Sequence, residues 1–595
     1  MEIIFVFLII HLRYECLGEV LETDKECFIP DNDIKIKKYL PEYMRCHRHV
    51  VLQNLNLTIL RGGAYSDLQC DFLSLKRNNI QAIHPGAFKE SSIINLDLSE
   101  NFLKCLFTDR LPPNDLEVLD LSKNKITYIE PGSFPSTITD LDLSFNGITE
   151  FDIDNFDNCE GIRKLRLAGN GLVSLILNKD LMTKLENLDL SYNSIHQYNF
   201  SDLVSLSHLN LRSNKLRRLM QKSFSNLDNL EELDLSNNKL DDALIMLEQF
   251  PKLLTLKLQN NNIKQIQHNL FLSSKNLGDL DLSGNSLQNF NFTNNDLRKL
   301  WRLKLNNMEL RQIHSSQFLN LNALYELELS YNSLSNFEDF NIPTLWRLDL
   351  SFNRLTRIWN NFIHLKALGS LDLSHNNIYR FNIEDCDLER IWKIKLNNNY
   401  IGRISDRHLP NMKVLLFLDL SNNHLKTFSI SENKLSRLRI MDISSNNISD
   451  YDEDTFESFT NLRFLSLRNN FIGQVPSYIL FENSQMFHLD LSYNLITSFK
   501  YNRHPLNTTL KTFNIFGNPI NCIHLRQIEE FCHQNRIDLN ICDKHCRADG
   551  KTPVCVDYGC DCETVFNSLT EMYLRKVHQN SIQKCSFEEL THNLV

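Results

Sequence analysis

The side chains with the most reactive chemistry in this sequence are cysteines, and they crowd toward the two ends of the chain. With His533 and His545 nearby, the thiolates that follow residue 520 could bind a zinc ion. In an exported chain the same crowding indicates disulfides. We therefore expect disulfide-rich caps, with Cys27 and Cys46 as one pair, and no metal or other cofactor. The predicted disulfide cysteines are Cys27, Cys46, Cys522, Cys532, Cys542, Cys546, Cys555, Cys560, Cys562 and Cys585.

The N-terminus favours export. Residues 3–10 are all apolar and Cys16-Leu17-Gly18 resembles a cleavage site, so we expect a signal peptide at residues 1–18. A buried N-terminal strand is the alternative. No later stretch reaches the roughly 18 apolar residues that span a bilayer, so we expect no membrane span. Five sequons fit a secreted, extracellular glycoprotein, with glycan sites at Asn56, Asn199, Asn291, Asn447 and Asn507.

A second group of chemically informative residues combines aromatic and basic side chains. Three of the four tryptophans, and one tyrosine, directly follow a recurring apolar residue, and Arg or Lys often comes next. Trp, Tyr and Arg are the side chains that anchor most interfaces. We predict a binding surface here; the alternative is that the rings lie flat on their neighbours and bind nothing. The predicted binding residues are Trp301, Arg302, Lys304, Tyr325, Trp346, Arg347, Trp392, Lys393 and Lys395.

An acidic residue recurs at the outward strand position between the second and third leucines of many repeats, beginning with Asp97, Asp120 and Asp142. A row of such carboxylates could attract a cation or a basic partner. The alternative is that they stay solvated and bind nothing. No nucleophile, metalloprotease or phosphate-loop motif occurs, so we do not expect an enzyme. The formal net charge of -10 argues against a nucleic-acid partner.

A repeat, L-x-x-L-x-L-x-x-N-x-L, must position these side chains, and residues 116–126 state it most plainly. From Asn78 to Asn518 it advances 440 residues in 19 steps, or about 23 residues each. We number the repeats 1 to 20; repeat 11 has Met308 where the others have asparagine, which should loosen one turn. The asparagines are Asn78, Asn101, Asn124, Asn146, Asn170, Asn193, Asn214, Asn238, Asn261, Asn285, Asn332, Asn353, Asn376, Asn399, Asn423, Asn446, Asn470, Asn494 and Asn518.

The alternation x-L-x-L-x predicts a short strand with leucines inward and the x residues outward. The asparagine amide can then satisfy backbone groups where the chain turns. A phenylalanine recurs further on and should fill the convex side. Cys70, Cys159 and Cys386 fall at core positions, whereas Cys105 has no assigned place. The recurring phenylalanines are Phe88, Phe134, Phe156, Phe224, Phe271, Phe318 and Phe456.

This pattern resembles the extracellular leucine-rich repeat superfamily, in particular the Toll-like receptor ectodomain type, to which segments 80–88 and 126–134 are similar. The resemblance implies an α/β-type leucine-rich repeat solenoid, a horseshoe with a parallel concave sheet and disulfide-rich terminal caps. We expect an N-terminal cap at 19–51, the solenoid at 52–521, and a cysteine-rich cap with a short helical tail at 522–595. Leu525, Ile528 and Phe531 would form the helical stripe that covers the last coil.

The opening of the C-terminal cap, residues 517–522, is similar to that of the family, but His524 stands where a second cysteine is usual. Its disulfide pairing is therefore not carried over. The chain also resembles the secreted leucine-rich immune proteins of mosquitoes. The resemblance implies a secreted recognition protein that holds a protein or glycan ligand on its concave face, in innate immunity. The alternative functions are a structural matrix or cell-adhesion component that assembles through its caps and an enzyme inhibitor. The chain could also form a homo- or heterodimer.

Overall fold

The structure is a computed structural model that describes residues 48–151, 159–177, 182–241, 250–266, 270–271, 273–287, 290–292, 297–337, 340–430, 434–449, 459–475, 485–498, 509–520 and 522–541. The predicted signal peptide, most of the N-terminal cap with Cys27 and Cys46, and the tail from residue 542 lie outside these residues. The chain divides into two units, residues 1–262 with 270–277, and residues 263–269 with 278–595.

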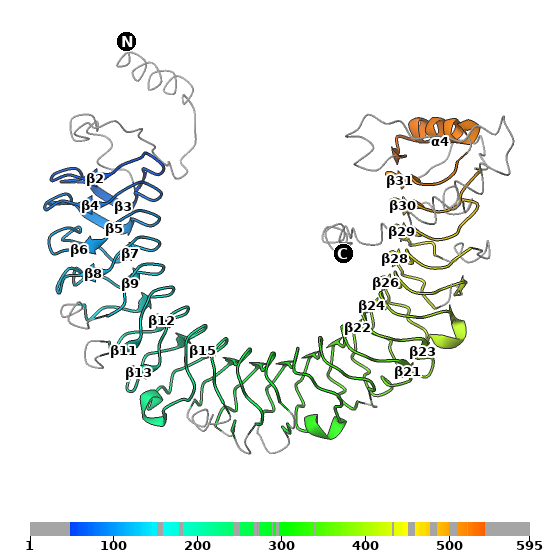
Figure 1. Ribbon diagram of the computed structural model, residues 1–595, viewed down its shortest axis with the longest axis horizontal. Helices are drawn as coiled ribbons and strands as arrows, with labels where there is room; N and C mark the ends of the chain where they lie inside the picture. Colours follow the sequence, from blue (N-terminus) through cyan, green and yellow to red (C-terminus); the bar gives the residue numbers. More distant parts are fainter. Residues whose placement is uncertain are drawn as a thin grey trace, which may run out of the picture. The chain divides into compact units, whose positions relative to one another are not determined.

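In the first unit each repeat contributes one short strand to a parallel sheet, and each strand pairs with the next one along the chain (Figure 1). The strands are β1 (His49–Val51), β3 (Gln69–Ser74), β5 (Ser92–Asp97), β7 (Val118–Asp120), β9 (Asp140–Asp142), β10 (Lys164–Arg166), β12 (Asn187–Asp189), β14 (His208–Asn210), β15 (Glu232–Asp234) and β16 (Thr255–Lys257). The registers place equivalent repeat positions side by side, so Leu188 lies between Leu165 and Leu209.

The second unit repeats this arrangement, again with parallel pairing throughout. Its strands are β17 (Asp279–Asp281), β18 (Arg302–Lys304), β19 (Glu326–Glu328), β20 (Arg347–Asp349), β22 (Ser370–Asp372), β24 (Lys393–Lys395), β26 (Phe417–Asp419), β28 (Ile440–Asp442), β29 (Phe464–Ser466), β30 (His488–Asp490), β31 (Thr512–Asn514) and β32 (Asp538–Asn540). The predicted parallel-strand solenoid is confirmed. We call the side on which the outward strand residues lie, predicted as the concave side, the sheet face.

Leucines on the inner side of the strands form the core, as predicted; Leu303, Leu327 and Leu348 are all fully buried. The repeat asparagines hold the turn that follows each strand. Asn376 shows the pattern: its Nδ2 donates to the C=O of Leu350 in the preceding coil at 2.9 Å and of Leu373 in its own at 3.1 Å. Its Oδ1 accepts the N–H of Leu355, also in the preceding coil, at 3.0 Å. Each asparagine therefore ties its own coil to the preceding one.

Opposite the sheet, short parallel pairs and 3-10 turns complete the coils. The pairs are β2 (Ile59–Leu60) with β4 (Ala82–Ile83), β6 (Cys105–Leu106) with β8 (Tyr128–Ile129), β11 (Ser174–Ile176) with β13 (Gln197–Asn199), β21 (Arg357–Trp359) with β23 (Arg380–Asn382), and β25 (Ile404–Ser405) with β27 (Phe428–Ser429). The 3-10 turns are η4 (Gln221–Phe224), η6 (Ser315–Phe318) and η7 (Asp406–His408). The predicted phenylalanines that the structure describes, Phe88, Phe134, Phe224, Phe271 and Phe318, are all buried. Phe156 and Phe456 lie outside the described residues.

The residue before each repeat asparagine adopts a left-handed backbone conformation in all twenty repeats, with φ between 52° and 57° for the residues other than glycine. This conformation normally favours Gly and Asn, yet the chain also places Phe352 and His375 there. A backbone hydrogen bond to the next coil fixes the turn; the N–H of Phe352 donates to the C=O of Ser374 at 3.0 Å. The turn therefore fixes the backbone and leaves the side chain outside the core.

After the last repeat the helix α4 (Cys522–Asn535) buries Ile528 and Phe531, as the helical stripe predicts, while Leu525 is half-buried. The chain then adds β32, which pairs in parallel with β31. The sequence analysis did not anticipate this extra strand. It gives the last repeat a backbone partner, which would otherwise present an unpaired strand edge.

Repeat 11 departs from the asparagine pattern without an open turn. Met308 is buried, and Oδ1 of Asn332 accepts both its N–H at 3.0 Å and that of Leu310 at 3.1 Å. The bond to Leu310 is the one that every repeat asparagine makes to the preceding coil, and the bond to Met308 is an additional one. The carbonyls of Leu282 and Leu305 each lack the second amide donor that the other repeats supply.

We expect Met308→Asn to raise the free energy of unfolding by about 1 kcal/mol, because the restored amide adds hydrogen bonds to a buried turn. Chemical denaturation followed by circular dichroism measures the change. Met412→Asn is the contrasting control. Met412 is fully buried at an apolar core position of its repeat, where an asparagine amide is not at the turn position. This control substitution should lower stability. A Met308→Asn chain that is less stable than the wild type would contradict this account of the turn.

Candidate binding surface

The predicted aromatic residues lie on four of five consecutive coils in the second unit, at the start of the strands, with Gly369 at the equivalent position of the fifth coil. The N–H of Tyr325 donates to the C=O of Trp301, that of Trp346 to Tyr325, that of Gly369 to Trp346 and that of Trp392 to Gly369, each at 2.8 Å. Trp301 and Tyr325 are 45% and 47% exposed, and Trp346 and Trp392 are half-buried. We call Trp301, Tyr325, Trp346 and Trp392 the aromatic strip.

Gly369 connects the two parts of the strip. A Cβ at this position would lie 2.4 Å from Cε2 of Trp346, so the indole ring lies directly on the glycine backbone. The rings of Tyr325 and Trp346 are nearly parallel, with centroids 6.0 Å apart and planes at 11°. Since contacts within the strip fix these rings, they form a surface that needs little rearrangement to bind a partner.

The basic residues beside the strip do not form the basic surface that we expected. Arg302 lies among three carboxylates, with its guanidinium 3.9 Å from Asp279, 3.2 Å from Glu326 and 3.0 Å from Glu328. Lys304 lies 3.9 Å from Glu328. Strand neighbours thus neutralise these charges, because acidic and basic residues alternate between adjacent strands at equivalent positions.

The remaining predicted basic residues are also engaged. Arg347 lies 3.0 Å from Glu326, and Lys395 lies 3.5 Å from Asp372. The ammonium of Lys393 lies over the rings of Phe417, at 4.9 Å, and Trp392, at 6.0 Å. The surface beside the strip is therefore a network of ion pairs and cation–π contacts that fixes the side chains.

Burial alone would raise the pKa of the Glu328 carboxyl, but hydrogen bonds from Asn306 and Arg302 and the nearby cations hold that pKa below its usual range. Asn306 Nδ2 donates to Glu328 at 2.8 Å. Glu328 consequently stays ionised beside Arg302, and this network keeps its charges at neutral pH.

The acidic row of the sheet face serves the turns. Oδ1 of Asp97 accepts the N–H of Ser99 at 2.9 Å, and Asp120 and Asp142 make the same bond to Ser122 and Ser144 at 2.8 Å. Burial raises the pKa of Asp120, and the neighbouring acids add to the rise. These half-buried carboxylates are therefore acceptors for the turns, and their attraction of a cation or a basic partner stays a prediction.

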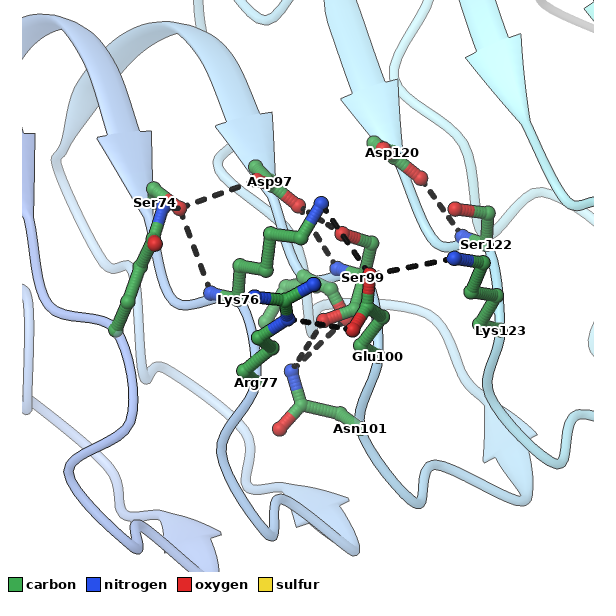
Figure 2. Close-up of polar contacts among 12 residues, drawn as sticks. Ser74, Lys76, Arg77, Asp97, Ser99, Glu100, Asn101, Asp120, Ser122 and Lys123 are labelled. Carbon is green, nitrogen blue, oxygen red and sulfur yellow. Dashed lines mark hydrogen bonds and ion pairs between the residues drawn. The ribbon is translucent and has the colours of Figure 1, made fainter. Parts of the chain in front are cut away.

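Near the first repeats, Glu100 gathers three cations, as Figure 2 shows. Its carboxylate accepts a hydrogen bond from Arg77 Nε at 2.7 Å and lies 3.3 Å from Lys123 and 3.4 Å from Lys76. The Arg77 hydrogen bond is the main cause that lowers the pKa of Glu100 to about 2. The sequence analysis missed this group because Glu100, Arg77 and Lys123 are adjacent only through the left-handed turn position of consecutive repeats.

A second feature that the sequence analysis missed lies further along the sheet face. Phe417, Ile440 and Phe464 occupy the outward position next to the strand leucine in three consecutive repeats, and all are buried. Phe464 also stacks on His488, with centroids 4.3 Å apart and planes at 12°. The sequence contains a signal for this cluster. At Phe417, Ile440 and Phe464 the alternation of inward leucines and outward polar residues fails, because an apolar residue stands at an outward position.

Other predicted residues have the following outcomes. Cys532, for which we expected a disulfide, is a buried free thiol whose pKa burial raises to about 12. Cys70 and Cys159 are buried, as predicted, and Cys386 is also buried. Cys105 is exposed on β6, where its neighbour across the pair is Tyr128. The other cap cysteines lie outside the described side chains, so their disulfides remain predictions.

The predicted glycan sites differ in accessibility. Asn56, Asn291 and Asn447 are exposed, and Asn199 is half-buried at the end of β13, where its Oδ1 accepts the N–H of Ser201. Asn507 lies outside the described residues. Within the described part of the chain, no group of three His, Cys, Asp or Glu side chains is arranged to hold a metal ion. Likewise, no helix there is long and apolar enough to cross a membrane.

Comparisons with known proteins agree with this architecture. Residues 114–172, 183–240 and 430–472 match the model of the leucine rich repeat family, and residues 246–342 match that of the BspA type leucine rich repeat region. Tsukushi of Gallus gallus is 34% identical over 166 residues, 27% of this chain and 44% of Tsukushi. The chain thus spans less than half the length of that relative.

One solved structure with a TM-score above 0.5 shows the same fold. A leucine-rich repeat protein of Leptospira interrogans matches 72% of this chain and 96% of its own, with a TM-score of 0.51 and 23% identity. TLR13, solved in a complex with single-stranded RNA, matches 87% of this chain and 94% of its own at 19% identity and a TM-score of 0.39. Together with the parallel strands and the asparagine turns, the family matches identify the chain as a leucine-rich repeat protein.

Proposed function

We propose that the chain is an extracellular recognition protein that holds a protein partner against the aromatic strip. The observation that carries the proposal is the pair of exposed rings, Trp301 and Tyr325, continued by the fixed indole of Trp346. Exposed aromatic clusters on a soluble protein usually mark contact surfaces. The ion-pair network beside the strip supplies polar groups for the rim of an interface.

A protein partner fits this surface better than a small ligand. The strip spans the coils of repeats 11 to 15, about 20 Å at ~4.8 Å per coil, and it is flanked by paired charges along its length. Binding proteins of this class use such wide, preformed surfaces, and we expect no catalysis. Secretion rests on the apolar N-terminus and the sequons, and a role in innate immunity rests on the resemblance to Toll-like receptor ectodomains and mosquito immune proteins. Both are part of the proposal.

The test begins with an affinity purification from native extracellular fluid, after which the identified partner is titrated against variants. Trp346→Ala should weaken binding by about 2 kcal/mol, or roughly thirtyfold, because a central aromatic anchor typically contributes that much. The fold should survive, since Trp346 contributes no side chain to the leucine core. Gly369→Ala is a more specific variant. Its added methyl group must displace the indole of Trp346, but the apolar surface of the indole is not removed.

Leu254→Ala is the matched control. Leu254 occupies the equivalent repeat position and is 47% exposed, but it lies in the first unit, two repeats before Trp301. It should leave affinity unchanged. Equal affinity of wild type, Trp346→Ala and Gly369→Ala would overturn the proposal. If the chain is a matrix component, Trp346→Ala, Gly369→Ala and Leu254→Ala should all bind the partner as the wild type does, and the chain should self-associate as its concentration rises.

A further inference from the structure

A second exposed cluster lies outside the sheet face, on the strand pair of β21 and β23. Along β21, Arg357 is exposed, Ile358 is buried and Trp359 is exposed. Side chains two residues apart project from the same side of a strand. Arg357 and Trp359 therefore share one outward surface, and Trp359, the one tryptophan outside the aromatic strip, is 67% exposed.

Arginine recurs at this position in three consecutive repeats, four residues after the repeat asparagine. Arg357 and Arg380 are direct partners across the strand pair. The N–H of Tyr400 donates to the C=O of Ile378 at 2.9 Å, which joins the coil of Arg403 to that of Arg380. All three arginines are exposed. We call Arg357, Arg380 and Arg403 the arginine row.

Tyr379 holds part of this row in place. Nε of Arg357 donates to the hydroxyl of Tyr379 at 2.7 Å. The guanidinium carbons of Arg357 and Arg380 lie 5.5 Å and 5.9 Å from the centre of the same ring. A guanidinium that is already positioned loses less conformational freedom when it binds an anion.

The charge of the row is uncompensated. Among the residues that the structure describes, no carboxylate forms an ion pair with these three arginines or with the exposed Arg354 nearby. On the sheet face, by contrast, Arg302 and Arg347 are paired with acids. Like charges opposite each other in paired strands are destabilising. In a chain with a formal net charge of -10, such a cluster is suited to an anionic partner.

We propose that the arginine row, with Trp359 and Tyr379, binds a sulfated oligosaccharide. Adjacent coils are ~4.8 Å apart, so the row presents three guanidiniums over roughly 10 Å, as a line rather than a pocket. Guanidinium forks bind oxyanions through paired hydrogen bonds. A linear polymer with repeated sulfates matches a line of such forks, and flat aromatic rings can pack against the apolar faces of its sugar rings.

The inference relies on the extracellular location given under the proposed function, because sulfated glycans are encountered there. It concerns another surface than the aromatic strip. The two proposals therefore fail independently: Trp346→Ala should leave oligosaccharide binding unchanged, and loss of the arginine row should leave the protein partner of the strip bound.

The experiment titrates the full chain with a size-defined heparin decasaccharide at 0.15 M salt and measures affinity by calorimetry. The triple variant Arg357→Gln/Arg380→Gln/Arg403→Gln should bind about tenfold more weakly or worse, because three charge-assisted contacts are lost. Trp359→Ala should weaken binding several-fold. The matched control Lys104→Gln/Lys215→Gln/Lys239→Gln removes three exposed positive charges elsewhere and should change affinity less than about twofold.

Two further probes separate sulfate recognition from general attraction of anions. A desulfated decasaccharide should not bind, and poly-L-glutamate of similar length should compete only weakly. Loss of binding in the lysine control equal to that in the arginine triple variant would overturn the proposal, as would absence of binding by the wild type. Competition by poly-L-glutamate as strong as by the decasaccharide would assign the row to an acidic protein segment instead.

Discussion

Replacing Asn376 by alanine should lower the free energy of unfolding by about 3–5 kcal/mol, the largest effect that we expect from one substitution. The side chain is buried, donates to three carbonyls and accepts the N–H of Leu355. Alanine leaves these backbone groups buried without partners. Because each lost partner costs about 1–3 kcal/mol, several together account for the expected loss even after partial relaxation.

Asn377→Ala is the matched control, since Asn377 is the same residue type one position on and is exposed. Urea denaturation of both variants, followed by circular dichroism, measures the difference. Stacked repeats transmit a local loss to their neighbours, so the midpoint of the whole transition should shift. Similar midpoints for Asn376→Ala and Asn377→Ala would mean that the asparagine bonds contribute little to stability.

Replacing Asp442 by asparagine should stabilise the chain at pH 8 by about 2–4 kcal/mol and change little near pH 4. Burial is the main cause that raises the pKa of Asp442 to about 7, and the charges of Asp419 and Asp490 add to it. Burial raises the pKa of Asp419 too, although hydrogen bonds from Ser421 and the charge of Lys395 oppose the rise. Burial lowers the pKa of His488, so this histidine supplies little compensating charge at neutral pH.

The direction follows from proton binding. The folded chain binds the Asp442 proton more tightly than the unfolded chain, whose carboxyl titrates near pH 3.8. Stability is therefore highest below about pH 4 for this group and is lost as pH rises toward 7. Asparagine removes the ionisation and retains the oxygen that accepts the N–H of Ser444 at 2.8 Å.

Denaturation at pH 4.5 and at pH 8 tests this expectation. Asp189→Asn is the control, because Asp189 makes the same turn bond to Ser191 at 2.9 Å but lies between Arg166 and Asn210. Asparagine should not stabilise the chain there. An Asp442→Asn chain with wild-type stability at pH 8 would show that burial and the charges of Asp419 and Asp490 do not destabilise the ionised Asp442 carboxylate.

The fold was predictable because its determinants are local and recur every 23 residues or so. The inward leucines, the turn asparagines and the buried phenylalanines each occupy a fixed repeat position, so one correctly assigned repeat places the others. Met308 illustrates the limit: the sequence shows that an amide is missing, but only the structure shows that Asn332 makes an additional bond to the N–H of Met308. Compensation by a neighbouring coil has no signature within one repeat.

The binding surface was predictable in part for the same reason. Repeat position alone placed Trp301, Tyr325 and Trp346 in one row, as the backbone bonds confirm. It did not reveal that Arg302 and Arg347 would be neutralised, because ion pairing depends on side-chain reach between coils. Repeat position also did not reveal the arginine row. The x-L-x-L-x pattern predicts which way side chains point only within the strands of the sheet, and the arginines follow the asparagine.

The left-handed residue of each turn has a consequence for how this surface can diversify. Its backbone is fixed by bonds between coils, such as that from the N–H of His375 to the C=O of Asn397 at 2.9 Å, whatever the side chain. Tyr331, Phe352 and His375 occupy this position in consecutive repeats and stack with centroids 4.2 Å and 4.0 Å apart. Other repeats have small, polar, charged or aromatic residues there, including the Arg77, Glu100 and Lys123 group. Substitutions at these twenty positions can therefore change the surface without changing the packing of the core. After duplication of such a gene, we expect the copies to differ most readily at these positions.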